Sequence, residues 1–187
     1  ELRNNKVWAC CHGWLILCQE PHRFSLFNPA TLESIHLPPL DLRPNQKISD
    51  CVLSSSPRSH PNSTVMLFER NLQSIIFCRI GDKDWTSRHY GKQIKEIDGK
   101  KDENLRISSP VSCQGKIYAR TSMSKLILID INEQNELVLR WLQIKLPPKR
   151  IWLSIRITKY LVESCEELFI IYVMHGGASD ETIISVE

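Results

Sequence analysis

The chain has 187 residues, of which 42% are hydrophobic and 24% are charged, and its formal charge at pH 7 is +3. This length suits one domain with a sizeable core or several repeats of a propeller, and the composition is that of an ordinary globular protein. The small and evenly interspersed charge argues against nucleic acid as a partner. The sequence contains no apolar run of about 18 residues and no signal-peptide pattern, so we expect no membrane association.

The seven cysteines are scattered along the chain without any C-x-x-C pair. Most of them lie in or beside apolar runs, as buried free thiols do. An odd number without a paired spacing favours a reducing compartment over a secreted protein with a disulfide framework. We therefore expect an intracellular protein, located in the cytoplasm, the nucleus or both.

The first forty residues predict an antiparallel meander. Its three short apolar runs, separated by turn-forming residues, lie within residues 11–17, 24–31 and 35–39. Each run is too short for a helix. Pro29 presets φ for the first corner of one turn, and Asn28 can hydrogen-bond the backbone that follows it. The last run ends at Pro38-Pro39.

A second meander follows after a loop. Residues 54–63 are rich in turn formers and have nothing to pack, so we interpret them as a loop. The apolar runs 65–68 and 75–78 then predict two strands joined by residues 70–73. Residues 92–106 mix charges of both signs, and we interpret them as a solvated loop. No segment shows a sustained helical period with caps, so we expect few helices or none.

The opening pattern returns in the second half of the chain. Cys113-Gln114-Gly115 aligns with Cys11-His12-Gly13, and residues 144–148 align with residues 35–39. Because Gly13 and Gly115 are two repeats apart, one repeat has about 50 residues, the length of a kelch-like propeller blade. A fourth meander starts near Lys159.

We therefore predict an all-β, kelch-like β-propeller of about four blades, in a ring that need not be complete. The chain would be a single domain or a fragment over residues 1–187, with blades at about 7–39, 50–90, 107–148 and 157–187. Its expected core contains Trp14, Ile16, Leu26, Leu67, Ile76, Phe77, Ile117, Leu128, Ile129, Leu161, Phe169 and Ile171. A two-sheet sandwich is the structural alternative, but the periodicity favours the propeller.

Several ordered motifs are similar to those of a known family. They are Gly13–Leu17, Asn28–Thr31, Leu37–Pro39, Phe77–Thr86, Gly115–Ala119, Tyr160–Ser164 and Leu168–Ile171. Together they resemble the β-propeller domain of the large plant F-box family of KIB type, in the family's order. The chain departs from that pattern at Ile80, where the family usually has Pro, and at Glu166, where it usually has Gly. Without this Gly we expect a looser hairpin at Glu166.

The resemblance implies a protein–protein interaction module that recognises the substrate of an F-box type ubiquitin ligase. In such proteins the F-box docks on a Skp-type adaptor and the propeller holds the target. This chain lacks the F-box, so we expect a Skp-type adaptor as a partner only if an F-box lies upstream. We expect a fragment or a truncated product, with unpaired edge strands and poor solubility when it is isolated.

Motifs for catalysis or cofactor binding are not evident. The six histidines show no metal-ligand spacing, and Cys11 and His12 would point to opposite faces of a strand. His175-Gly176-Gly177 is not accompanied by a nucleophile elbow, and there is no phosphate-binding Gly-rich loop. We predict no enzymatic activity and no cofactor. The alternative is a small-ligand-binding or hydrolytic β-propeller that uses the central channel.

The five tryptophans could line a binding face or wedge the blades together, and their strand positions favour the second interpretation. The segment around Trp152 is different, because Lys149, Arg150 and Arg156 surround it with positive charge. We select Trp152, Arg150 and Arg156 as candidate partner-binding residues.

Overall fold

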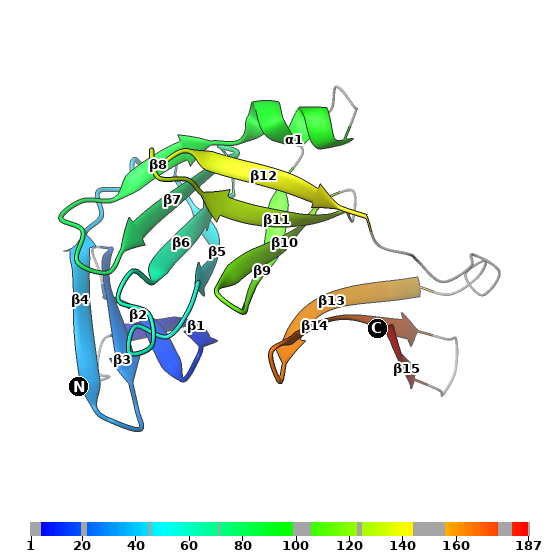
Figure 1. The fold of residues 1–187 in the computed structure, drawn as a ribbon, viewed down its shortest axis with the longest axis horizontal. Coiled ribbons are helices and arrows are strands. Elements are labelled where there is room, and N and C mark those ends of the chain that lie inside the picture. Colours follow the sequence, from blue (N-terminus) through cyan, green and yellow to red (C-terminus); the bar gives the residue numbers. More distant parts are fainter. Residues whose placement is uncertain are drawn as a thin grey trace.

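A computed structural model describes residues 5–19, 22–44, 46–70, 72–98, 106–122, 125–143, 156–175 and 181–186. These residues form four antiparallel sheets and one helix, which confirms the all-β propeller prediction. In Figure 1 the sheets follow one another along an arc, and the described strands leave the ring open between the fourth sheet and the first. No helix in the described part of the chain is long and apolar enough to span a membrane.

Within each sheet the strands pair in chain order. The first sheet contains β1 (Asn5–Cys11), β2 (Trp14–Gln19), β3 (Arg23–Asn28) and β4 (Glu33–Pro39). The second contains β5 (Ile48–Leu53), β6 (Thr64–Glu69), β7 (Ser74–Arg79) and β8 (Thr86–His89). The third contains β9 (Ile107–Cys113), β10 (Lys116–Thr121), β11 (Leu126–Ile131) and β12 (Leu137–Leu142). The fourth contains β13 (Arg156–Ser164), β14 (Glu167–His175) and β15 (Glu181–Val186).

The first strand of each sheet lies innermost. β1 lies against β5, β5 against β9 and β9 against β13, so these four strands surround a common axis. The pairing register shifts in the first three of them, opposite the strand that follows. Such a bulge bends a strand and increases its twist. The repeat that is visible in the sequence is therefore also a repeat of strand geometry.

Tight two-residue turns join the first and second strands of three sheets. Both residues of each turn have positive φ, at His12 (52°) and Gly13 (77°), Gln114 (49°) and Gly115 (74°), and Cys165 (53°) and Glu166 (64°). These are the backbone angles of type I′ hairpins, which match the twist of the strands. The looser hairpin expected at Glu166 is wrong, because Ser164 pairs directly with Glu167 across a two-residue turn.

The Asn28 turn forms as the sequence predicts. The Asn28 side-chain Oδ1 accepts hydrogen bonds from the backbone N–H groups of Ala30 (2.9 Å) and Thr31 (3.3 Å). Asn28 is itself buried, so these bonds satisfy a polar group that would otherwise be costly to remove from water.

Two apolar clusters join the first three sheets. One lies between the first and second sheets and includes Trp14, Leu26 and Leu67, while the other lies between the second and third sheets and includes Phe77 and Ile127. Most of the predicted core residues are buried. The exceptions are Leu128, Phe169 and Ile171, which are only half-buried. The prediction was wrong at these positions because strand alternation turns Ile127 and Tyr172 inward instead.

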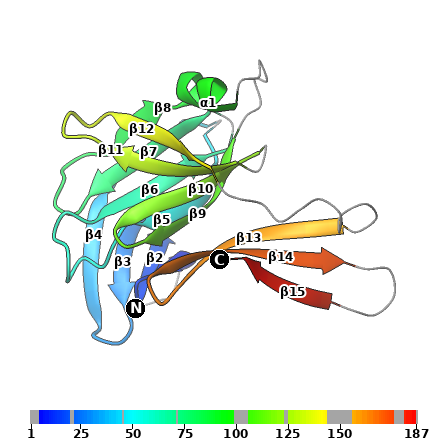
Figure 2. The same ribbon diagram turned by 45° about the vertical axis from the view of Figure 1, so that its right-hand side comes forward.

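One helix, α1 (Gly91–Asp98), covers the first part of the charged segment 92–106, for which the sequence predicts a solvated loop. The loop prediction was therefore wrong for these residues. Tyr90 and Ile94 are buried in the cluster between the second and third sheets, and Ile97 packs against it. Their spacing of four and three residues places them on one helix face. Figure 2 shows α1 beside β8 and β12, at the outer edge of the two sheets.

The tryptophans divide between the two interpretations. Trp14 is buried, and the Trp85 indole N–H donates to the Pro38 carbonyl oxygen at 2.8 Å, which ties the second sheet to the first. Trp141, by contrast, is 46% exposed on β12, with the Lys125 Nζ 4.6 Å from its ring centroid. The wedge interpretation is therefore wrong for Trp141, whose ring lies on the outer surface of the third sheet.

Candidate functional site

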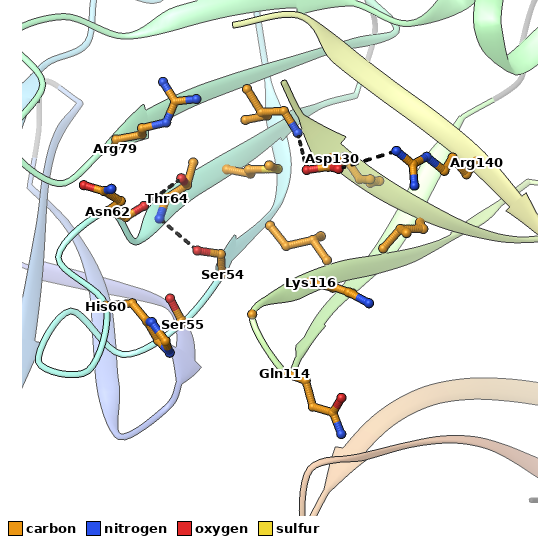
Figure 3. A pocket seen from close by; sticks show the side chains of 16 residues that line it. Ser54, Ser55, His60, Asn62, Thr64, Arg79, Gln114, Lys116, Asp130 and Arg140 are labelled. Carbon is orange, nitrogen blue, oxygen red and sulfur yellow. Dashed lines mark hydrogen bonds and ion pairs between the residues drawn. The ribbon is translucent and has the colours of Figure 1, made fainter. Parts of the chain in front are cut away.

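A groove of about 500 Å³ lies between the second and third sheets. Its walls come from the β5–β6 loop, the adjoining ends of β6 and β7, and the strands β10, β11 and β12 (Figure 3). The polar side chains labelled in Figure 3 surround this space from both sheets. We call it the interblade groove.

The β5–β6 loop forms the wall from the second sheet and is held by its own hydroxyl groups. Ser55 Oγ and Ser63 Oγ are buried and 2.9 Å apart, and Ser63 Oγ donates to the His60 carbonyl oxygen at 2.6 Å. Ser54 Oγ accepts from the Thr64 backbone N–H at 2.9 Å. The prediction that this loop has nothing to pack was therefore wrong, since buried serines fix the positions of exposed His60 and Asn62.

Arg79 stands at the end of β7 and reaches across to the third sheet. Its Nη1 donates to the side-chain Oδ1 of Asn135, which lies in the turn between β11 and β12. The Asn135 carbonyl oxygen also accepts from the Arg88 Nε at 2.9 Å. Asn135 has a φ of 58°, a conformation that Asn tolerates better than most residues. Two arginines of one sheet therefore hold a single turn of the next, and this contact positions the Arg79 guanidinium at the groove.

The wall from the third sheet carries Lys116, Asp130 and Arg140. Asp130 Oδ1 accepts from the Ile131 backbone N–H at 2.8 Å, and Asp130 Oδ2 is 3.9 Å from the Arg140 Nη2. Both side chains of this pair are more than half exposed, so the pair stabilises the fold by less than about 1 kcal/mol. Lys116 is exposed and directly follows the tight turn at Gly115.

The groove combines an apolar interior with a cationic surface. Met66, Ile117 and Ile129 line it and are at most 3% exposed, so they form its deeper part. Among the described lining residues, the three cations Arg79, Lys116 and Arg140 outnumber the one carboxylate, Asp130. The described residues contain no cluster of His, Cys, Asp and Glu that could hold a metal ion. The arrangement suits binding by hydrogen bonds and ion pairs above an apolar surface.

Residues 1–186, almost the whole chain, match the family model of the KIB1-4 beta-propeller. The chain belongs to the KIB1-4 beta-propeller family. No curated protein matches the sequence. The family match and the sheets agree on the propeller, and the groove lies between two neighbouring blades of it.

None of the candidate residues from the sequence is among the described residues that line the interblade groove of this KIB1-4 beta-propeller. Lys149, Arg150 and Trp152 lie outside the described residues. Arg156 begins β13, and only its backbone is described. Their proposed role in partner binding therefore stays a prediction.

Sequence reasoning missed the groove because its residues come from distant segments. Ser54 and Arg140 are far apart in the chain and line the same groove only because neighbouring blades pack together. The one available signal is the repeat itself, which places Lys116 directly after a turn glycine as it places Trp14 after Gly13. A cationic residue at a position that is buried and aromatic in another blade points to a difference between the blades at this place.

Proposed function

We propose that this KIB1-4 beta-propeller is a protein-binding module and that the interblade groove holds a segment of its partner. The observation that carries this proposal is the groove itself, an open surface built by loops and strands of two blades. Loops positioned by a rigid β scaffold are common places for recognition. Its polar side chains include His60, Asn62 and Lys116, all of which are exposed and available for contact.

We further propose the role that the motif resemblance implies, which is substrate recognition for an F-box type ubiquitin ligase of plants. The ordered motifs and the family match support a KIB-type propeller, and the repeat length suggests a kelch-like one. The propeller would hold the target, and a Skp-type adaptor would bind only through an F-box upstream of this chain. In this role the protein is intracellular and is not itself an enzyme.

Affinity purification tests the protein-binding role. The tagged protein is expressed in cells with Lys116→Glu and Arg140→Glu together, and the proteins recovered are identified by mass spectrometry. Lys92→Glu on α1 is the matched control, because Lys92 is exposed and does not line the groove. We expect the groove variant to lose partners that the wild type and the control retain. Identical recovery from all three proteins would exclude the groove as the binding site.

A small-ligand-binding or hydrolytic propeller is the second candidate. The groove volume of about 500 Å³ favours it, because small-molecule pockets have volumes of about 300–1,000 Å³. A thermal-shift screen of metabolites separates the two candidates. A ligand that raises the melting temperature of the wild type, but not of Lys116→Gln, would favour this second function.

A further inference from the structure

The interblade groove has a charge pattern that selects a particular kind of partner. Three cationic side chains, Arg79, Lys116 and Arg140, surround a space in which Asp130 is the only carboxylate among the described lining residues. That carboxylate interacts with Arg140 across 3.9 Å and is more than half exposed, so it only partly neutralises the site. Three cations less one carboxylate give the described lining of the groove a formal net charge of +2.

The cations are placed so that an incoming anion can use them. Within the described residues the Lys116 side chain makes no hydrogen bond or ion pair, and its ammonium group has three donors. Arg79 uses Nη1 to hold Asn135, and its other guanidinium N–H groups remain as donors in a fixed orientation. An oriented guanidinium loses little side-chain entropy when it binds a carboxylate.

The apolar part of the groove argues for a peptide over a small anion. Met66, Ile117 and Ile129 lie deeper than the cations, and half-buried Leu128 and Ile131 extend this apolar wall along β11. A small anion would use the cations and leave this wall in contact with water. A peptide that carries both acidic and apolar side chains would cover both parts.

We infer that the interblade groove binds an extended segment of a partner protein that carries acidic side chains next to an apolar one. The carboxylates pair with Lys116, Arg140 and the remaining donors of Arg79, and the apolar side chain lies against Met66 and Ile117. This inference rests on the proposed protein-binding function and adds the chemistry of the partner. The charge complementarity would contribute mainly to selectivity and to the association rate.

Fluorescence polarisation with the 187-residue chain tests the inference. The probe is a short labelled peptide of alternating glutamate and serine with one central leucine, and two matched peptides replace glutamate with glutamine or with lysine. We expect the glutamate peptide to bind about tenfold more tightly than the others at low salt, and to lose this advantage in about 0.5 M salt. Equal binding of the three peptides, or binding of none, would overturn the inference.

Groove variants locate the binding site without depending on loss of fold. Lys116→Gln combined with Arg140→Gln should weaken binding of the glutamate peptide about fivefold, whereas Lys92→Gln on α1 should leave it unchanged. Asp130→Asn should strengthen it about twofold, because it removes the one opposing charge and keeps the Oδ1 that Ile131 N–H needs. A gain of affinity cannot result from unfolding. Unchanged affinity in both groove variants would contradict this site.

Competition with inorganic phosphate distinguishes a peptide site from a small-anion site. Phosphate should displace the glutamate peptide only as chloride does at the same ionic strength. Specific displacement at low phosphate concentration would show a small-anion site and overturn the inference. The two proposals can fail separately, since partners recovered from cells that depend on the groove but lack acidic segments would contradict only the peptide chemistry.

Discussion

Glu166 occupies a backbone conformation that suits glycine. It is the second residue of the β13–β14 turn, with a φ of 64°, where Gly13 and Gly115 occupy the equivalent turns of other blades. A left-handed conformation costs a residue with a side chain about 1–2 kcal/mol, and glycine avoids that cost. The Glu166 carbonyl oxygen, which accepts from Gln114 Nε2 at 2.9 Å, does not depend on the side chain.

We therefore expect Glu166→Gly to raise the free energy of opening of the fourth sheet by about 1 kcal/mol, measured by native-state hydrogen exchange in β13 and β14. Ser164→Gly is the matched control, because Ser164 is an exposed residue of the preceding strand, where glycine should destabilise by about 0.5–1 kcal/mol. A loss of stability in Glu166→Gly would mean that the Glu166 side chain stabilises the fold by more than its left-handed backbone conformation costs.

Glu69 is a buried carboxyl group at the end of β6. It is 3% exposed and accepts hydrogen bonds from Gln46 Nε2 at 2.6 Å and from Ser74 Oγ. Burial raises the pKa of the Glu69 carboxyl, and the Gln46 hydrogen bond and the charges of Arg43 and His89 only partly oppose this shift. The folded state therefore binds the Glu69 proton more tightly than the unfolded state does.

This shift sets the sign of a pH dependence. Where the folded state holds more protons than the unfolded state, the free energy of unfolding falls as the pH rises. The stabilising contribution of protonated Glu69 is therefore fully present below about pH 4.3 and is lost as the pH rises through the raised pKa. Glu69→Gln keeps a neutral hydrogen-bonding side chain and removes this titration. We expect the melting temperature of Glu69→Gln to vary less with pH between about 4.3 and 7 than that of the wild type. If the melting temperatures of the two proteins changed in parallel with pH, the titration of Glu69 would not be the cause of the pH dependence.

For single residues, the sequence predicts a role where that role depends on near neighbours in the chain. The turn residues Asn28 and Gly115 follow from backbone chemistry that involves only near neighbours. Glu69 does not, because a glutamate at the end of an apolar run gives no sign that Gln46 and Ser74 will enclose it. Its burial depends on the connection before β5 packing over the end of the second sheet.

Among the elements, α1 shows how charge can conceal a helix. The segment around it contains lysines, glutamates and aspartates, and this composition is also typical of a solvated loop. The decisive residues are Tyr90, Ile94 and Ile97, which are few but lie on one face. A helix of eight residues is marginal without tertiary packing, so its existence depends on the cluster that it covers.

Gln93 gives α1 a second role at the edge of the third sheet. Its Nε2 donates to the Leu137 carbonyl oxygen at 2.7 Å, and its Oε1 accepts from the Leu139 backbone N–H at 2.9 Å. Both backbone groups lie on β12, the outermost described strand of that sheet. One amide side chain thus satisfies two groups that a neighbouring strand would otherwise pair.

We expect Gln93→Ala to lower the free energy of unfolding by about 1–3 kcal/mol, because it leaves two partly buried backbone groups unpaired. Gln93→Glu should lower the free energy of unfolding by less, since its carboxylate can still accept from the Leu139 N–H but cannot donate to the Leu137 carbonyl oxygen. Lys95→Ala on the exposed face of the same helix is the control and should change little. Urea denaturation measures all three, and a loss in Gln93→Ala no larger than in the control would exclude this role.

For the whole molecule, the recurrence of short strands and turn residues was enough to predict the arrangement of sheets. A spacing of about 50 residues between repeats implies stacked four-stranded units, whatever the side chains are. The interblade groove needs more information, because it depends on which residues of two blades face one another. Arg79 and Arg140 line one space only through the packing of β7 near β11 and β12, which no local pattern encodes.

In the part of the chain that the structure describes, the fourth sheet does not share an apolar cluster with its neighbour as the first three sheets do. Residues of β13, β14 and β15 are absent from both apolar clusters as far as the described residues show. In Figures 1 and 2 this sheet stands apart from the first three. The contacts that hold it include three hydrogen bonds from the third sheet to backbone carbonyls, from Cys113 and Gln114 to Glu166 and from Arg120 to Lys159. A few bonds of this kind stabilise much less than a shared apolar core.

We therefore expect the fourth sheet to open without unfolding the first three sheets. In native-state hydrogen exchange, amides in β6 and β10 should exchange only through global unfolding, while amides in β13 and β14 should exchange at a lower free energy. Gln114→Ala should increase exchange in β13 and β14 and leave β6 unchanged, because it removes one bond between the two parts. Equal protection of all these strands would show instead that the four blades unfold as one cooperative unit, and the Glu166→Gly gain would then appear in every blade.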